Sequence, residues 1–454
     1  MLANKYFKIT IKVMIIIFLL LTYYGCLMKS LDTDMYFLVA SGRDILDGNF
    51  YTNSYTGLSV VIQQWLYDVI LAKFVGNNTI FQLFFVFLQN LLLLSVSSIF
   101  MYKKTHKLYN SIVLPLFCLI TTSHYLINIR PECITITLLV LQIIVLEKYK
   151  ESGNKFKYLL WLIPICLLEA NLHNALFLYH ILFLLPYIDK KVTLMSIPML
   201  GCSLCTPYGL DGFLYVFNSY RYKTFDYVYI EEVSRLFSIS SKTINYVYIS
   251  IILIMIFSLV ILLNIKKKST NQINIYSILV ILLSLISYRH NMLIYIPLLL
   301  ISIVINFDYI ILVCSIALLL YNGIYLTPQY PLSFEIPSYI QKEDTTFASF
   351  VVGNYLEYNG YKTYIDARPE LYMPYMCGEN RLYEYRLLMY GLDLNENKVD
   401  DEEILKILDK FKYSILRDDS YAATLIRDKY IDRYTELEIV DEKYIIFKKE
   451  EFRK

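Results

Sequence analysis

Charged residues are scarce in this 454-residue chain. Asp, Glu, Lys and Arg make up 18% of it, whereas soluble domains contain about 25%. The formal net charge is only +2, which excludes a nucleic-acid binder that acts through a basic excess. Hydrophobic residues reach 57%, a content that excludes intrinsic disorder. We therefore expect no nucleic-acid partner.

The eight cysteines show no disulfide framework. Cys202 and Cys205 have a C-x-x-C spacing, but a second pair, a nearby histidine and a βαβ context are all missing. Every cysteine except Cys377 lies in or beside an apolar segment, where free Cys behaves as a small hydrophobic residue. We predict neither a secreted disulfide scaffold nor a redox or zinc role.

Long apolar runs dominate the chain, and the mean hydropathy is +0.46. A helix needs about 20 residues to cross the hydrocarbon core of a bilayer. The apolar runs therefore predict an all-α polytopic membrane bundle of about eleven transmembrane helices. The candidate segments are residues 11–28, 79–101, 109–127, 132–147, 158–171, 174–188, 192–206, 246–264, 273–288, 291–306 and 308–327.

The charged residues concentrate in the tail, from about residue 330 onward. This contrast predicts a transmembrane domain over residues 1–329 and a small α/β domain over 330–454. Within the first domain, residues 29–78 form an outer loop with an interfacial helix expected at 58–75. The elements expected in the tail are strands at 347–352, 362–366 and 413–416, helices at 402–411 and 421–430, and a hairpin of 437–440 with 444–447.

Lysine clusters predict the orientation, because Lys and Arg concentrate in cytoplasmic loops. The clusters at 5–12, 103–107, 148–157, 190–191 and 266–268 all fall on one side of the predicted bundle. We therefore expect a multi-pass protein of the cell membrane, with a cytoplasmic N-terminus and an extracytoplasmic C-terminal domain. The first segment is expected to remain as a span, since it ends in Cys-Leu-Met-Lys rather than in a small-residue cleavage site.

Polar residues gather at the predicted outer face of this bundle. Asp32 and Asp34 follow the first span, and Trp65 is a candidate interfacial anchor. A single His or Arg at the end of a span is also typical of a solvated terminus, so the hypothesis depends on the whole group. The other members of the group lie at predicted outer turns or breaks between spans: Arg130, Glu169, His173, Arg289 and His290.

These residue types suit the transfer of a group from a phosphate carrier to a hydroxyl. A carboxylate can act as the general base toward an acceptor hydroxyl. An Asp-x-Asp pair can instead bind a divalent cation such as Mg²⁺ or Mn²⁺. Arg forms bidentate contacts with phosphate oxygens, and His can add a hydrogen-bond donor near neutral pH.

Residues 31–43, LDTDMYFLVASGR, resemble the first outer loop of type C glycosyltransferase-like membrane proteins, in particular a poorly characterised bacterial branch. The resemblance continues into Gln64-Trp65-Leu66 and extends over most of the chain. Further short motifs follow in the same order: Arg130-Pro131, Asn171-Leu172-His173, Pro207-Tyr208-Gly209, Arg289-His290, Gly353-Asn354-Tyr355-Leu356 and Asp366-Ala367-Arg368.

The resemblance implies an inverting hexosyl or pentosyl transferase. Such an enzyme takes a sugar from a polyprenyl-phosphate-type donor and transfers it to an extracytoplasmic lipid-linked acceptor, or to a surface glycan or protein. It implies that Asp32 and Asp34 are catalytic, and they are also the candidate metal ligands. The candidate residues for substrate or phosphate binding are Trp65, Arg130, His173, Arg289 and His290.

The chain departs from the pattern of this branch at several positions. Gln63 and Gln64 replace His-Glu, Leu38 replaces His, and Asn174 replaces Gly. Whether the interfacial helix expected at 58–75 binds a metal or relays protons therefore stays open. The alternative functions are a non-enzymatic exporter or assembly factor for lipid-linked polysaccharide, or a polysaccharide polymerase or ligase. The sugar, the acceptor and the oligomeric state also stay open.

Overall fold

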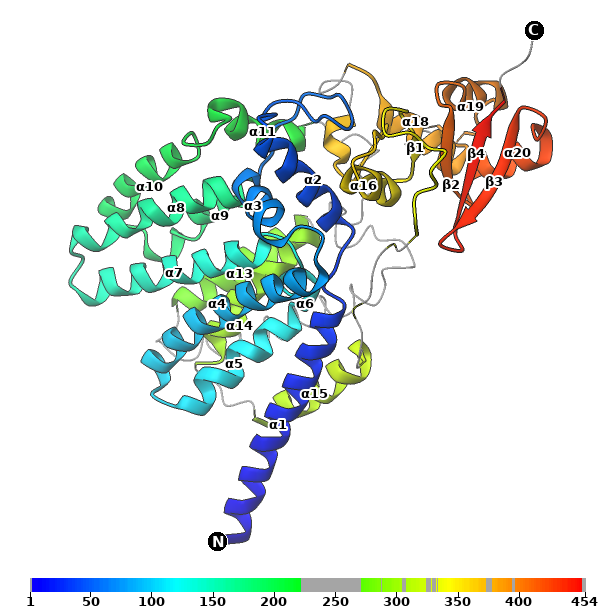
Figure 1. The fold of residues 1–454 in the computed structure, drawn as a ribbon. Coiled ribbons are helices and arrows are strands. Elements are labelled where there is room, and N and C mark those ends of the chain that lie inside the picture. Colours follow the sequence, from blue (N-terminus) through cyan, green and yellow to red (C-terminus); the bar gives the residue numbers. More distant parts are fainter. Residues whose placement is uncertain are drawn as a thin grey trace. The chain divides into compact units, whose positions relative to one another are not determined.

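The chain is mostly helical, with a small mixed sheet near its C-terminus, as the computed structural model shows (Figure 1). The structure describes residues 2–221, 271–286, 288–303, 308–323, 328, 332, 334–372, 378–393 and 397–450. The predicted span at 246–264 lies outside the described residues, as does the side chain of Arg289.

The other ten apolar segments all fold mainly as helix, as predicted from their composition. Their α-helices are α1 (Leu2–Met28), α4 (Thr79–Thr105), α5 (Leu108–Thr121), α6 (Ser123–Leu126), α7 (Glu132–Glu151), α8 (Leu162–Leu172), α9 (Leu178–Leu182), α10 (Lys190–Cys202), α13 (Asn271–Ile286), α14 (Tyr295–Ile301) and α15 (Asp308–Asn322). The short 3₁₀ helices among them are η2 (Phe156–Trp161), η3 (Asn174–Leu176), η4 (Leu185–Tyr187) and η7 (Tyr288–Ile294). Helix α11 (Gly209–Arg221) follows α10.

Helix ends follow from local chemistry. The Asn78 side chain accepts hydrogen bonds from the N–H groups of Ile80 and Phe81, which caps the start of α4. At the other end, His106 adopts a left-handed conformation that terminates the helix. Asp189 caps α10 in the same way as Asn78 caps α4, through the N–H groups of its first turn.

Two helices in the described part of the chain are long and apolar enough to cross a membrane, over Tyr6–Met28 and Thr79–Thr105. The shorter apolar helices reach 10–17 residues. Prolines and 3₁₀ turns divide the apolar runs: Pro115 lies inside α5, Pro198 lies inside α10, and η3 separates α8 from α9. The number of spans therefore stays a prediction.

The chain divides into two compact units. Unit 1 comprises Met1–Leu31, Asn77–Val216 and Tyr227–Gln329. Within it, α1 packs along α15, α4 packs against α5 and α7, and α8 packs against α7 and α10. Unit 2 comprises Asp32–Gly76, Phe217–Asp226 and Tyr330–Lys454. The first loop therefore packs with the tail, whereas the sequence analysis grouped it with the apolar segments.

The first loop of unit 2 forms α2 (Asp34–Leu46), α3 (Trp65–Ile70) and the π-helix η1 (Leu71–Val75). The helix expected at 58–75 is wrong over its first third, because helical structure begins only at Trp65. The β-branched run at 60–62 disfavours a helix, and Ser59 just before it bridges to Thr52 in extended backbone. Helix α2 packs closely on α3: a Cβ at Gly42 would lie 2.0 Å from the Asp68 carbonyl oxygen.

The tail of unit 2 contains a four-stranded sheet in the order β1-β2-β4-β3. The strands are β1 (Phe347–Ala348), β2 (Tyr413–Arg417), β3 (Tyr434–Val440) and β4 (Tyr444–Lys449). β1 runs parallel to β2, and the other two pairs are antiparallel. The predicted hairpin is confirmed: residues 441–443 form its loop, and Asp441 and Glu442 both have positive φ, which turns the chain back within a few residues.

The helices of the tail are α16 (Phe350–Tyr358), η8 (Pro369–Tyr372), α18 (Arg381–Tyr390), α19 (Asp401–Leu408) and α20 (Tyr421–Lys429). The predicted helices at 402–411 and 421–430 and the strand at 413–416 are confirmed. The strand predicted at 347–352 is confirmed only at Phe347–Ala348, which form β1, because residues 350–352 begin α16. The strand predicted at 362–366 is wrong, since these residues contribute one isolated bridge, from Thr363 to Thr346.

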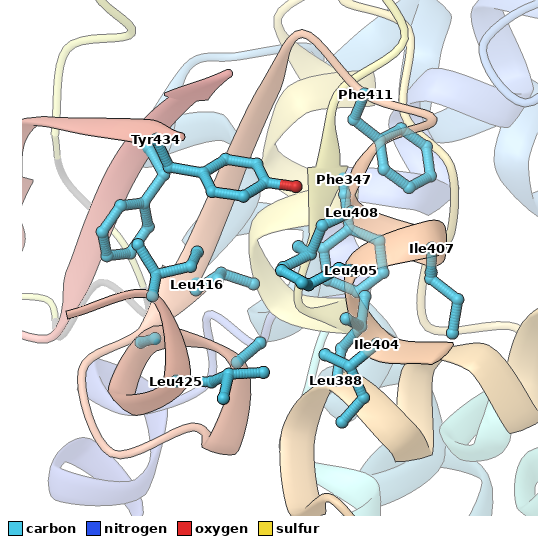
Figure 2. Packing of buried hydrophobic residues seen from close by; sticks show 14 of the residues in the cluster. Phe347, Leu388, Ile404, Leu405, Ile407, Leu408, Phe411, Leu416, Leu425 and Tyr434 are labelled. Atoms are coloured by element: carbon cyan, nitrogen blue, oxygen red, sulfur yellow. The ribbon is translucent and has the colours of Figure 1, made fainter. Parts of the chain in front are cut away.

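One hydrophobic core holds this tail together. Figure 2 shows apolar side chains of α19, α20 and the sheet facing one another around Leu408 and Leu416. Phe347, on β1, packs its ring 5.5 Å from that of Phe411. Burying each such side chain stabilises the fold by about 1.5–3 kcal/mol, so the core is sufficient to fix the sheet.

Candidate functional site

Asp32 and Asp34 lie at the start of α2 in unit 2, and both are partly exposed. The Asp32 carboxylate accepts hydrogen bonds from the Thr33 hydroxyl at 3.2 Å and from the Asp34 N–H at 3.3 Å. The N-terminus of a helix carries partial positive charge, which favours carboxylates at this position. The two acids are thus accessible and held in an ordered turn.

Asn354 of α16 ties this acidic turn to the Asp366-Ala367-Arg368 motif. Its side-chain amide donates a hydrogen bond to the Thr33 carbonyl at 3.1 Å, and its side-chain oxygen accepts one from the Ala367 N–H at 2.9 Å. Asn354 is fully buried. Three motifs that are remote in sequence therefore meet in unit 2.

A buried ion cluster lies next to this connection. Arg368 donates to both carboxylate oxygens of Asp366 and contacts Glu357 at 3.4 Å. Its guanidinium also donates to the Ser41 hydroxyl at 3.1 Å and lies over the Phe37 ring, so it links the tail to α2. Asp366 and Arg368, two residues apart in one motif, therefore pair directly, and Glu357 is a further member that was not predicted from the sequence.

The two carboxyl groups of this cluster have opposite pKa shifts. Burial, opposed and outweighed by the charge of Arg368 and its hydrogen bonds, leaves the pKa of Asp366 below its ordinary value. Burial, reinforced by the negative charge of Asp366, raises the pKa of Glu357 well above its ordinary value. The cluster thus favours the ionised form of Asp366, paired with Arg368, and binds a proton on Glu357 more tightly than water would.

Trp65 is the first residue of α3, half-buried, with its ring 6.3 Å from that of Phe50. Asp68 of the same helix is fully buried. Burial raises its pKa well above the ordinary value, although the charge of Arg368 opposes the shift. The first loop therefore presents Asp32 and Asp34 at its surface, whereas Asp68 lies in its interior, where burial favours the protonated form.

A second polar cluster lies within unit 1, on α7 and α8. Glu169 and His173, one helical turn apart, both contact the hydroxyl of Thr135. The Thr135 oxygen lies 2.8 Å from Glu169 Oε1 and 2.9 Å from His173 Nδ1. All three side chains are buried, so these contacts form in an apolar interior where hydrogen bonds are strong.

His180 of α9 completes this cluster. Its Nε2 lies 3.7 Å from Glu169 Oε2, and its Nδ1 lies 2.7 Å from Gln142 Oε1. The Gln142 amide also donates to the His180 carbonyl at 2.8 Å. His180 and Glu169 are both fully buried.

The remaining candidate residues of unit 1 lie at helix ends. Arg130 is half-buried and precedes α7 by two residues. Arg289 belongs to η7. His290, also on η7, points its Nδ1 at the Leu283 carbonyl at 2.6 Å and packs its ring edge-on against Tyr179. Because Tyr179 adjoins His180 in α9, the structure brings His290 into the neighbourhood of the His180 cluster.

The described residues contain no group of three His, Cys, Asp or Glu side chains arranged to hold a metal ion. Asp32 and Asp34 offer two carboxylates. This is the number of protein ligands that Mg²⁺ often takes when substrate phosphate supplies further oxygens. A cation in this site would therefore depend on the substrate for its coordination.

Sequence analysis missed Thr135, Gln142 and His180. A signal was present, because Thr135 and Gln142 are seven residues apart in an apolar segment and so lie on one helix face. His180 likewise interrupts the apolar run 174–188. Polar residues that recur on one face of an apolar helix indicate a buried polar partner.

Comparison with known proteins gives no further assignment. No protein-family model matches the chain, and no curated protein is significantly similar to it.

Proposed function

We propose that the protein is a membrane glycosyltransferase of the type C kind. It transfers a sugar from a polyprenyl-phosphate-type donor to an extracytoplasmic lipid-linked acceptor, or to a surface glycan or protein. The observation that carries the proposal is the acidic turn at Asp32 and Asp34, which is accessible and anchored by Asn354. The apolar helices and the order of the sequence motifs support the same function.

In this proposal Asp32 or Asp34 is the general base. It accepts the proton of the acceptor hydroxyl, whose oxygen attacks the anomeric carbon from the face opposite the phosphate. The bond between the anomeric carbon and the phosphate oxygen breaks, and the lipid phosphate leaves with the electron pair. The sugar is transferred with inversion.

The candidate phosphate-binding residues lie in unit 1, and we propose a role toward phosphate for each of them from its own chemistry. Arg130 and Arg289 supply guanidinium donors, which suit phosphate oxygens. His173 and His290 add imidazole donors near neutral pH. Trp65 is assigned to the sugar or the lipid at the membrane interface. If Mg²⁺ or Mn²⁺ is used, Asp32 and Asp34 hold it together with the donor phosphate.

The test compares glycolipids and surface glycans by mass spectrometry. A strain that lacks the gene is complemented with the wild-type chain, with Asp32→Asn, with Asp34→Asn, or with both substitutions. We expect the glycans made with the variant that removes the base to lack the transferred sugar. The rate of transfer should fall by at least about 10²-fold, as is typical for a lost general base. Undiminished transfer by the double variant would overturn the proposal.

Asp47→Asn is the matched control, because Asp47 is an exposed acid that immediately follows α2. It should leave transfer unchanged. Asn354→Leu tests the anchor of the acidic turn. It removes both hydrogen bonds of the Asn354 side chain and should lower transfer while Asp32 and Asp34 remain.

The buried Glu169–His180 contact favours a second candidate, a non-enzymatic exporter of a lipid-linked substrate. Transporters place ionisable groups inside the apolar bundle next to broken helices, and η3 interrupts the helices between Glu169 and His180. An exporter would leave the glycan composition unchanged in the deletion strain, with intact substrate retained at the inner face. It would also tolerate substitution of Asp32 and Asp34.

A further inference from the structure

The hydrogen bonds of His180 define where its protons lie. The Gln142 amide donates to the His180 carbonyl, so the NH₂ end of that amide faces the carbonyl and its oxygen faces the imidazole. His180 Nδ1 must therefore carry a proton and donate it to Gln142 Oε1. The nitrogen left to face Glu169 is Nε2.

Glu169 Oε2 and His180 Nε2 face each other at 3.7 Å, and neither atom has a hydrogen-bond partner in the described part of the chain. Without a proton between them, the lone pairs of an imidazole and a carboxylate would oppose each other in a fully buried site, which is costly. One proton, on either atom, removes this repulsion. The contact is therefore a site that holds one proton.

This proton fixes the direction of the neighbouring hydrogen bonds. With its proton on the Oε2 side, Glu169 offers Oε1 as an acceptor, and the Thr135 hydroxyl donates to it. A hydroxyl has a single proton, so Thr135 can only accept from His173 Nδ1. His173 then carries its proton on Nδ1.

We propose that the Glu169–His180 contact holds one proton, on one of the two facing atoms, and that through Thr135 it fixes His173 in its Nδ1–H tautomer. Thr135, Glu169 and His180 are positioning residues for His173. The role of His173 toward the lipid phosphate rests on the proposed function, but the tautomer does not. At metal sites in other proteins, a hydrogen-bond partner on one ring nitrogen likewise sets the tautomer and the orientation of the imidazole.

The test is ¹⁵N NMR of the full-length protein, labelled on the histidine rings, in lipid nanodiscs. The chain has five histidines, and the His173 signals are assigned by their loss in His173→Phe. At a pH high enough for a neutral ring, we expect wild-type His173 to carry its proton on Nδ1. A wild-type Nε2–H ring would overturn the proposal without any variant.

Thr135→Val removes the bridge and should shift His173 toward the Nε2–H form that free histidine prefers, whereas Thr135→Ser should restore Nδ1–H. Glu169→Gln should keep Nδ1–H, because an amide at this position accepts from Thr135 and donates to His180. An unchanged His173 tautomer in Thr135→Val would overturn the proposal.

Thr137→Val is the matched control. Thr137 is a buried threonine of the same helix, but among the described residues its hydroxyl bonds only to the Cys133 carbonyl of α7. It should leave the His173 tautomer unchanged. Because NMR needs no turnover, the tautomer is tested separately from the transferase. Active Asp32 and Asp34 variants would overturn the proposed function and leave the inference standing.

Discussion

Both units bury charged side chains, but they compensate them differently. In unit 2, Arg368 lies between Asp366 and Glu357, and an arginine stays protonated at any physiological pH. In unit 1, Glu169 lies between the Thr135 hydroxyl at 2.8 Å and the His180 imidazole at 3.7 Å, and neither of these groups carries a permanent charge.

The difference indicates different tasks. A fixed guanidinium suits a permanent structural connection, because its charge and its planar set of donors do not change. A cluster of carboxylate, hydroxyl and imidazole can redistribute protons, which suits a site that handles them. We therefore interpret the Arg368 cluster as structural and the Glu169 cluster as functional, and the following predictions test that comparison.

The largest effect is expected from Arg368→Met. The substitution leaves Asp366 buried without its cation, which costs about 3–5 kcal/mol when one partner of a buried pair is removed. Thermal unfolding and limited proteolysis of the tail measure this loss. Arg427→Met is the control: Arg427 pairs with Glu436 at the surface, where such pairs contribute less than about 1 kcal/mol. Equal effects of the two variants would contradict a structural role for Arg368.

Gly42→Ala should have the next largest effect. The added Cβ would lie 2.0 Å from the Asp68 carbonyl oxygen, so α2 and α3 must move apart, at a cost of about 1–3 kcal/mol. The free energy of unfolding of unit 2 measures it. Gly201→Ala in α10 adds a methyl group where nothing lies within 4 Å, and it should leave stability equal or raise it by up to about 1 kcal/mol. A neutral Gly42→Ala would contradict the close packing of the first loop.

The stability of unit 2 should fall as the pH rises from the ordinary glutamate range through the raised pKa of Glu357. Folded Glu357 keeps a proton that the unfolded chain releases, so the slope reaches about −1.4 kcal/mol per pH unit for this one proton. The lowered pKa of Asp366 acts the other way and removes stability only in strong acid, below its ordinary value. The free energy of unfolding, measured across this pH range, should decline less in Glu357→Gln than in the wild type. An equal decline in the two proteins would contradict the raised pKa of Glu357.

The smallest effect is expected in unit 1. Glu169→Gln replaces a carboxylate by an amide that can accept from Thr135 and donate to His180, so the free energy of unfolding should change by about 1 kcal/mol or less. Thermal unfolding in nanodiscs measures it. A loss as large as that of Arg368→Met would show that the Glu169 cluster is also a structural charge pair.

The sequence predicts helices well where apolar residues run long, because runs of more than about ten residues exceed the usual length of a strand. It predicts their ends poorly. The segment before Trp65 is as apolar as the helix that follows, and only its β-branched residues distinguish it. The strand expected at 347–352 ends early for a related reason. Phe350 and Val351 suit a strand, but they begin α16, on which Asn354 bonds to Thr33 and Ala367.

Part of the candidate site is local in sequence and could be predicted. The Asp366–Arg368 pair and the acidic turn each lie within a few residues. The remaining members come from distant segments: Thr135 meets Glu169 across 34 residues, and Ser41 meets Arg368 across 327. Hydrogen-bond partners at such separations follow from packing, which a single sequence does not contain.

The bond from Ser41 to Arg368 also has a consequence for how the chain is made. A ribosome adds about 5–20 residues per second, so roughly 15–65 s pass between the synthesis of these two residues. During that interval the first loop exists without α16 and Arg368, the elements it packs on. Biogenesis of this protein therefore includes a waiting period in which an incomplete unit 2 must be kept from misfolding until its second half arrives.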